Sequence, residues 1–143
     1  MLPTERLDYS AIPQRRPLVL PGGARLAVWV IVNVEEWDPK ETMPRTVLTP
    51  PAGGAPMPDI PMMLVQHHES EYFTRRCIDT FDRLYREGAE RAKIMAIAIH
   101  PYISGQPHRI KYLEAVYDHI ARHAGVLHWQ GREILEWYLS AKS

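Results

Sequence analysis

Two continuous apolar runs, residues 26–34 and 92–100, limit the folds open to this chain. They read LAVWVIVNV and AKIMAIAIH, and both are rich in valine, isoleucine and alanine. An uninterrupted apolar run, rather than an alternating one, is typical of a strand buried on both faces of a parallel sheet. We therefore predict parallel strands near 26–34 and 92–100, with a short third strand near 126–129.

Helical periodicity fills the segments around these strands. Apolar residues recur every three or four positions within residues 70–87, 108–123 and 132–141, which predicts three amphipathic helices. Their inward faces are predicted to carry Phe73, Cys77, Phe81, Leu84 and Tyr85, then Ile110, Leu113, Tyr117 and Ile120, and finally Ile134, Leu135, Tyr138 and Leu139. The alternation of helix and strand predicts an α/β fold whose parallel strands are joined by right-handed crossovers.

The chain has the length of one domain, at 143 residues. Residues 1–24 are predicted to form a proline-containing N-terminal arm, and residues 25–60 to hold the first strand and a loop rich in proline and glycine. Residues 61–143 are predicted to form the C-terminal α/β part. A loop as long as the one predicted here is uncommon inside a compact domain, so its length requires a structural or functional explanation.

Composition excludes several classes of protein. Seventeen basic and seventeen acidic residues cancel, so the chain lacks the basic footprint of a nucleic-acid binder. No apolar run approaches the roughly 20 residues that cross a bilayer, and the first residues lack the apolar core of a secretory signal. The single cysteine, Cys77, fits a reducing compartment and is predicted to be a core residue. We expect a cytoplasmic protein with no membrane or nucleic-acid partner.

Ionisable side chains follow both long apolar runs. Glu35 and Glu36 come directly after the first predicted strand, and His100 ends the second. Active sites of parallel α/β folds lie at the carboxyl ends of strands, and this placement predicts acid–base chemistry between the carboxylates and the imidazole. His108 and Arg109 begin the next predicted helix, where an anion or a polarised oxygen can bind. The alternative to an active site is a structural role for these residues. Glu35 and Glu36 would then be solvated acids at the end of a strand, and His100 would be hydrogen-bonded to backbone at the edge of the core.

Two further histidine pairs are less informative. His67 and His68 are predicted to be solvated loop residues, because adjacent side chains diverge and chelate one ion poorly. His119 and His123 have the spacing of a helical metal pair, but His119 lies away from the predicted apolar stripe and no third ligand is evident. We predict that both are surface histidines.

Three segments of the chain resemble the polysaccharide deacetylase (NodB-homology) family, and within it the cytoplasmic subgroup of allantoinases and peptidoglycan deacetylase-like proteins. The first is VNVEEW at residues 32–37, and the second, longer and more specific, is MAIAIHPYISGQPHR at residues 95–109. The third runs from residue 125 to residue 138 and ends in EILEWY. The resemblance implies a partial (β/α) barrel of the NodB-homology type.

The resemblance also implies an activity, which is hydrolysis of a carbon–nitrogen bond other than a peptide bond. Its substrate would be a small molecule or a sugar amide, either an N-acetyl amide or a cyclic ureide such as allantoin. In the family one strand-end carboxylate is the catalytic base and the other a metal ligand, and the late histidine is the general acid. The residues so predicted are Glu35, Glu36 and His100 for catalysis, Glu36 for zinc or another divalent metal, and Trp37, His108 and Arg109 for substrate binding.

The chain departs from the family in its middle. No segment matches the histidine pair that completes the metal site, so that site looks incomplete, and a barrel of this general kind needs about 200 residues or more. We therefore expect an internal deletion with its junction near residues 58–61, and weak or no activity in this truncated form. The alternative is a non-catalytic remnant or a homo-oligomerising interaction module, because three strands leave open edges that pair with another copy.

Overall fold

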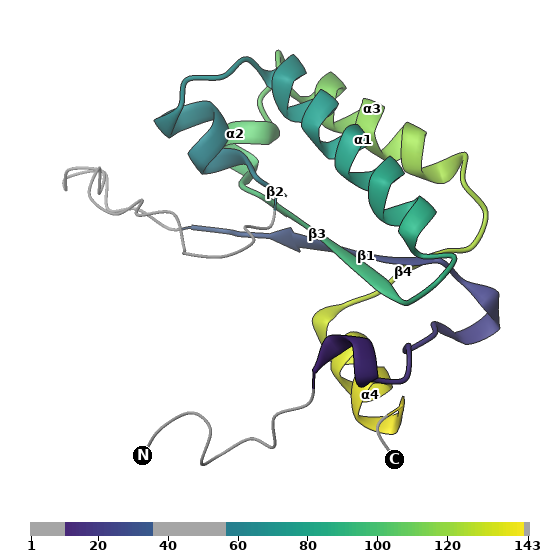
Figure 1. Ribbon diagram of the computed structural model, residues 1–143. Helices are drawn as coiled ribbons and strands as arrows, with labels where there is room; N and C mark the ends of the chain where they lie inside the picture. The colour runs from purple at the N-terminus through teal and green to yellow at the C-terminus, as the bar shows by residue number, and fades with distance from the viewer. Residues whose placement is uncertain (1–10, 36–56, 142–143) are drawn as a thin grey trace.

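The computed structural model describes residues 11–35 and 57–141. Within them the chain is a mixed α/β structure in which one parallel sheet carries helices on both sides, as Figure 1 shows. The strands are β1 (Leu26–Val32), β2 (Met57–Pro58), β3 (Lys93–Ile99) and β4 (Val126–His128), in the order β2-β3-β1-β4. The helices are η2 (Ile12–Gln14), η3 (Pro21–Gly23), η4 (Ile60–Val65), α1 (Ser70–Glu87), α2 (Pro101–Ser104), α3 (Ile110–Ala121) and α4 (Gly131–Ala141). The predicted fold class is confirmed.

The two long strands lie side by side in the centre of the sheet. β1 and β3 pair in parallel along their whole length, from Leu26 opposite Lys93 to Val32 opposite Ile99. Both strands therefore end at the same edge of the sheet, which we call the carboxyl rim; the opposite edge is the amino rim. Residues that follow β1 and β3 in the sequence are brought together at the carboxyl rim by this register alone.

The core lies between the sheet and the helices α1 and α3. On α1, Phe73, Cys77 and Phe81 are fully buried, as their spacing of four residues predicts. They pack against the sheet face formed by Leu26, Val28, Met95, Ile97 and Ile99 and against Leu113, Val116 and Ile120 of α3. Burial of each such side chain contributes about 1.5–3 kcal/mol, so this layer is the main source of stability.

The second face of the sheet is covered less completely. Trp29 of β1 lies on this face and packs against Gly131, where a Cβ atom would lie 2.9 Å from the indole ring. Beyond this contact α4 contributes no buried residue, and Leu135 and Leu139 are 56% and 57% exposed. The prediction that the apolar stripe of α4 faces inward is wrong for three of its four residues: Ile134 is half-buried, but Leu135, Tyr138 and Leu139 are exposed, because this side of the helix is only partly covered.

Three short elements around the carboxyl rim were not predicted. β2 adds a fourth strand by pairing with Ile97 and Ala98 of β3, within the segment predicted as a loop. The π-type helix η4 and the single turn α2 follow β2 and β3 directly. All three are too short to have a detectable period, and their places are decided by contacts with β3 and with the side chains described below.

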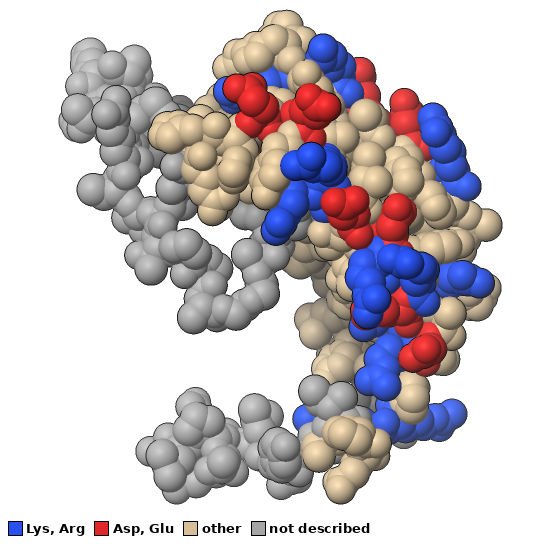
Figure 2. All heavy atoms as spheres, turned by 45° about the horizontal axis from the view of Figure 1, so that its top comes forward, with Lys and Arg blue, Asp and Glu red and all other residues tan. Residues whose placement is uncertain are grey.

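Charges of both signs are interspersed on the helical face of the molecule in Figure 2. On α1 alone, the charged residues include Arg75, Arg76, Asp79, Asp82 and Arg83. The face in view has no field of a single sign, as the zero net charge predicts. No helix among the described residues has the length and apolarity of a membrane span.

Candidate functional site

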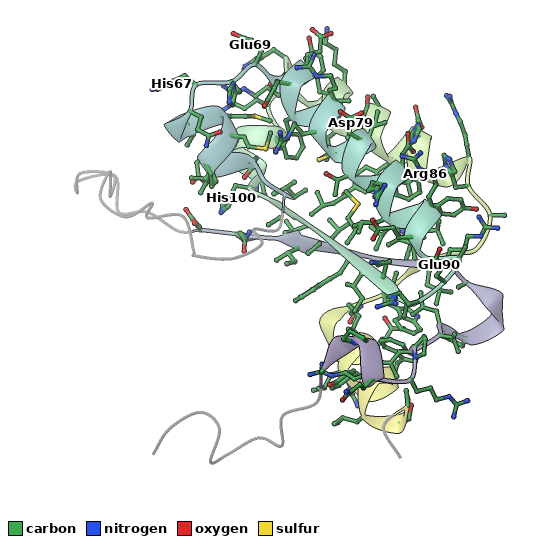
Figure 3. The ribbon with its side chains drawn as sticks, viewed as in Figure 1. His67, Glu69, Asp79, Arg86, Glu90 and His100 are labelled. Carbon is green, nitrogen blue, oxygen red and sulfur yellow. The ribbon has the colours of Figure 1, made fainter. Side chains whose placement is uncertain are left out.

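His100 stands at the carboxyl rim, immediately after β3. Its backbone is still extended (φ −120°, ψ 126°), and Pro101 opens the turn α2 directly after it. The strand thus ends abruptly at the histidine, which is buried. Figure 3 shows His100 at one end of the sheet and Arg86 and Glu90 at the other.

Asp59 holds the imidazole of His100 in place. The aspartate is fully buried, and its Oδ1 accepts a hydrogen bond from Nδ1 of His100 at 2.7 Å. Its Oδ2 accepts two more, from the backbone N–H of His100 at 2.7 Å and from the hydroxyl of Ser104 at 2.6 Å. Three donors surround one buried carboxylate, which satisfies it as a buried charge requires. Because Nδ1 donates to Asp59, Nε2 is the nitrogen left to exchange a proton.

Glu35 meets His100 from the other side. Its carboxylate lies three residues beyond β1, with Oε1 3.3 Å from Nε2 of His100, and its side chain is 32% exposed. The hydroxyl of Tyr102 donates to Oε2 at 3.2 Å. Burial, followed by the hydrogen bond to Glu35, raises the pKa of Tyr102 to about 12, so the phenol stays a donor at neutral pH. The backbone N–H of Asn33 donates to the carbonyl of Ile99 at 2.9 Å and extends the pairing of the strands toward Glu35.

The three side chains form a line from the interior to solvent. Asp59 is buried, His100 is nearly so, and the Glu35 carboxylate reaches water. A carboxylate that orients an imidazole, whose other nitrogen faces a second acid–base group, is an arrangement that moves protons to and from a substrate. We call Asp59, His100 and Glu35 the rim triad.

The rim triad does not by itself fit a zinc ion. A catalytic zinc takes about three protein ligands, and both oxygens of Asp59 are occupied by hydrogen bonds within the chain. Glu35 and Nε2 of His100 are the two donors that remain among the described residues of this rim. The predicted metal ligand Glu36 lies outside the described residues.

The other predicted site residues are not joined to the triad. His108 is exposed in the turn before α3, and Arg109 is the half-buried residue that precedes this helix. Among the described residues, no hydrogen bond or ion pair links either side chain to Glu35 or His100. Their role in substrate binding stays a prediction, as does that of Trp37, which lies outside the described residues.

Asp59 is the member of the triad that the sequence did not reveal. It stands in the segment MPDIPMM, residues 57–63, where it is the single charged residue among apolar ones and prolines. A lone acid in such a stretch is buried only if it has a partner, and this was the available signal. Its partner could not be named, since His100 is 41 positions away in the sequence.

A second group of histidines lies at the amino rim. His119 and His123 were predicted to be surface residues without a third ligand, but both are half-buried against α1, and Nε2 of His119 lies 2.6 Å from Oδ1 of Asp82. The ligand atoms of these three residues all lie within 4.8 Å of one another. The prediction failed because α3 packs against α1 as well as against the sheet, so two of its sides are covered.

Comparison with known proteins identifies solved structures with a similar fold. No protein-family model and no curated protein matches the sequence. A crystal structure of Puue allantoinase is similar, with a TM-score of 0.57 and 26% identity over 61% of this chain and 29% of that chain. A probable polysaccharide deacetylase from Pseudomonas aeruginosa PAO1 has a TM-score of 0.55 and 27% identity over 72% of this chain and 34% of its own. The chain thus spans about a third of each structure, and its fold is a part of the (β/α) barrel that they share.

Proposed function

We propose that this chain carries the proton-transfer residues of a hydrolase that acts on carbon–nitrogen bonds other than peptide bonds. The proposal rests on one observation, which is that His100 is fixed on Asp59 through Nδ1 while its Nε2 faces Glu35 at 3.3 Å. An allantoinase and a probable polysaccharide deacetylase, which are two of the similar structures, are named for reactions of this class.

Glu35 is the proposed base. A water molecule that enters beside Glu35 gives a proton to the carboxylate as its oxygen attacks the carbonyl carbon of the substrate. Tyr102 holds the second oxygen of Glu35 at 3.2 Å and so directs Oε1 toward the reacting water. This attack forms a tetrahedral intermediate. Its nitrogen must be protonated before the C–N bond can break.

His100 is the proposed acid. Nε2, when protonated, gives its proton to the departing nitrogen, and the C–N bond breaks as the carbonyl re-forms. Asp59 touches no reacting atom; its Oδ1, 2.7 Å from Nδ1, fixes the tautomer and the direction of the ring. The mechanism uses only side chains that the structure brings together.

The substrate we propose is an N-acetyl amide of a sugar or a cyclic ureide such as allantoin. Both present a planar amide carbonyl to the base and a nitrogen to the acid. We also propose that a central part of the barrel is deleted near residues 58–61 and that activity is weak as a consequence. Three things support this: the match to about a third of each similar structure, the direct pairing of β1 with β3, and the two donors left for a metal.

The test is hydrolysis of allantoin and of an acetylated glucosamine oligomer, with and without zinc. We expect slow turnover that falls about 10²-fold or more in Glu35→Gln and in His100→Gln, which is the usual contribution of a general base or acid. His128→Gln changes an exposed histidine of β4 and is the matched control, with unchanged turnover expected. Turnover that survives both rim substitutions, or that is absent with both substrates, would contradict the proposal.

The second candidate is a homo-oligomerising module without catalysis. Exposed apolar side chains favour it: Leu135 and Leu139 on α4, Ile94 on β3, and Val32 and Val34 at the end of β1. Sedimentation at several concentrations separates the two candidates. A dimer without turnover supports the module, whereas a monomer with turnover sensitive to Glu35→Gln supports the hydrolase.

A further inference from the structure

The amino rim holds a group of side chains that the proposed hydrolysis does not use. Asp82 lies one turn before the end of α1, His119 lies in the last turn of α3, and His123 follows two residues after α3 ends. We call these three residues the amino-rim cluster. The carboxyl-terminal ends of helices carry a partial negative charge, so a cation at this place is stabilised by α3 and, more weakly, by α1.

The donor atoms of the cluster converge. Nε2 of His119 is 2.6 Å from Oδ1 of Asp82, and one ligand atom from each of the three residues lies within 4.8 Å of the others. Zinc holds nitrogen and oxygen ligands at about 2.0–2.2 Å, which places two ligands of a tetrahedral site about 3.3 Å apart. Small rotations that separate His119 from Asp82 and bring His123 closer therefore suffice to enclose an ion.

His123 is already in the tautomer that a metal needs. Its Nδ1 lies 2.9 Å from the backbone carbonyl oxygen of His119, and a carbonyl only accepts, so Nδ1 carries the proton. Nε2 is then the nitrogen with a free lone pair. A hydrogen bond from the second ring nitrogen to a backbone carbonyl is the usual way in which metal-binding histidines are oriented.

Aromatic rings hold both imidazoles. The ring of Phe81 meets His119 and His123 edge-on, with centroids 5.6 Å and 4.9 Å away, and Tyr85 meets His123 at 5.0 Å. The hydroxyl of Tyr85 donates to the carbonyl of Ala124 at 2.7 Å and ties the segment after α3 to α1. The rings limit the motion of the ligands, while Asp82, 44% exposed at its side chain, leaves a path from solvent.

We propose that Asp82, His119 and His123 bind a divalent transition-metal ion of the zinc type and that this ion clamps α1 to α3. Two imidazoles and one carboxylate are donors that zinc accepts, and water completes the fourth position. The ion is separate from the rim triad, so the proposal does not depend on the proposed hydrolysis. A metal that binds the folded chain more tightly than the unfolded chain raises the stability of the fold.

The experiment is a zinc titration of the full chain after treatment with a chelator, followed by calorimetry and thermal unfolding. We expect one ion per chain and a rise in Tm of roughly 9 °C at a hundredfold excess over Kd. Asp82→Asn and His123→Gln should each weaken binding by about tenfold or more, whereas His128→Gln should leave it unchanged. Binding that is absent, that survives both cluster substitutions, or that is lost with His128→Gln would overturn the proposal.

A second measurement needs no substitution at the site. On addition of zinc, the imidazole signals of His119 and His123 should shift in NMR spectra of the wild-type chain, while those of His67 and His108, both exposed, stay in place. Zinc-dependent shifts confined to other histidines would equally overturn the proposal. This measurement decides the question even where a cluster variant does not fold.

Discussion

The two rims of the sheet each place a histidine against an aspartate. Nδ1 of His100 lies 2.7 Å from Asp59, and Nε2 of His119 lies 2.6 Å from Asp82. At the carboxyl rim the aspartate is fully buried and accepts three hydrogen bonds, whereas at the amino rim it is 44% exposed at its side chain. The same contact is therefore enclosed in the interior at the carboxyl rim and open to water at the amino rim, where we propose that an ion enters.

The two proposed uses follow from the different surroundings of the two carboxylate–imidazole pairs. A buried pair cannot separate without leaving charges unsatisfied, which suits a group that must hold one geometry while protons move. A half-exposed pair can exchange its mutual contact for an ion because water screens the intermediate states. Neither the spacing of His119 and His123 in the sequence nor the burial of their side chains is sufficient by itself to predict that they bind a metal.

Removal of the two aspartates should show the largest contrast between the rims. Asp59→Ala leaves the backbone N–H of His100, its Nδ1–H and the hydroxyl of Ser104 without an acceptor in the interior, so we expect a loss of about 3 kcal/mol in the free energy of unfolding. Asp82→Ala, measured in the presence of a chelator, should cost less than about 1 kcal/mol. Urea denaturation measures both, and equal losses would show that burial does not separate the rims.

A single donor to Asp59 should have an intermediate effect. Ser104→Ala removes a buried hydroxyl that donates to Oδ2 at 2.6 Å and leaves the two contacts with His100 intact. We expect the free energy of unfolding to fall by about 2 kcal/mol, within the range usual for a hydrogen bond to a charged group. Ser140→Ala is the control, since this exposed hydroxyl on α4 donates to a backbone carbonyl and should change stability by less than about 0.5 kcal/mol. A neutral result at Ser104 would mean that Asp59 is held by His100 alone.

Tyr102→Phe should have the smallest effect at neutral pH. The variant loses one hydrogen bond to a partly exposed carboxylate, so we expect a change of less than about 0.5 kcal/mol at pH 7. The pKa of Tyr102 is raised from 10 to about 12 in the folded chain, so the phenol contributes stability below pH 10 that is lost as the pH rises toward 12. Above pH 10 the free energy of unfolding of the wild type should therefore fall below that of the variant. Parallel pH curves for the two chains would show that Tyr102 does not face Glu35 in solution.

The main elements were predictable because their signals are local. Residues 70–87 were predicted as a helix from the spacing of Phe73, Cys77 and Phe81, and α1 has those bounds. The strands were predicted from continuous apolar runs, and β1 and β3 lie within the predicted ranges. Each of these signals repeats within a few residues and needs no knowledge of the rest of the chain.

Long-range partners explain what the sequence did not reveal. Asp59 lies between a two-residue strand and a short helix, neither of which has a period of its own, and its burial is explained only by its contact with His100. The predicted inward face of α4 failed for the same reason, since an apolar stripe shows that a helix can be buried but not how much of it the rest of the fold covers. Glu35 and His100 were predicted as neighbours because parallel pairing brings the ends of β1 and β3 together without any side-chain information.

The large separation of the rim residues in the sequence has a consequence for folding order. Asp59 and His100 are 41 positions apart in the sequence, and Glu35 and Tyr102 are 67 apart. His119 and His123 are only four positions apart. Closure of long loops must precede contacts of the first kind, so we expect the carboxyl rim to assemble late, once β1, β2 and β3 are aligned. The Nδ1 proton of His100, shielded from exchange by Asp59, is thus a natural reporter of the completed fold. Its NMR signal should appear last during refolding.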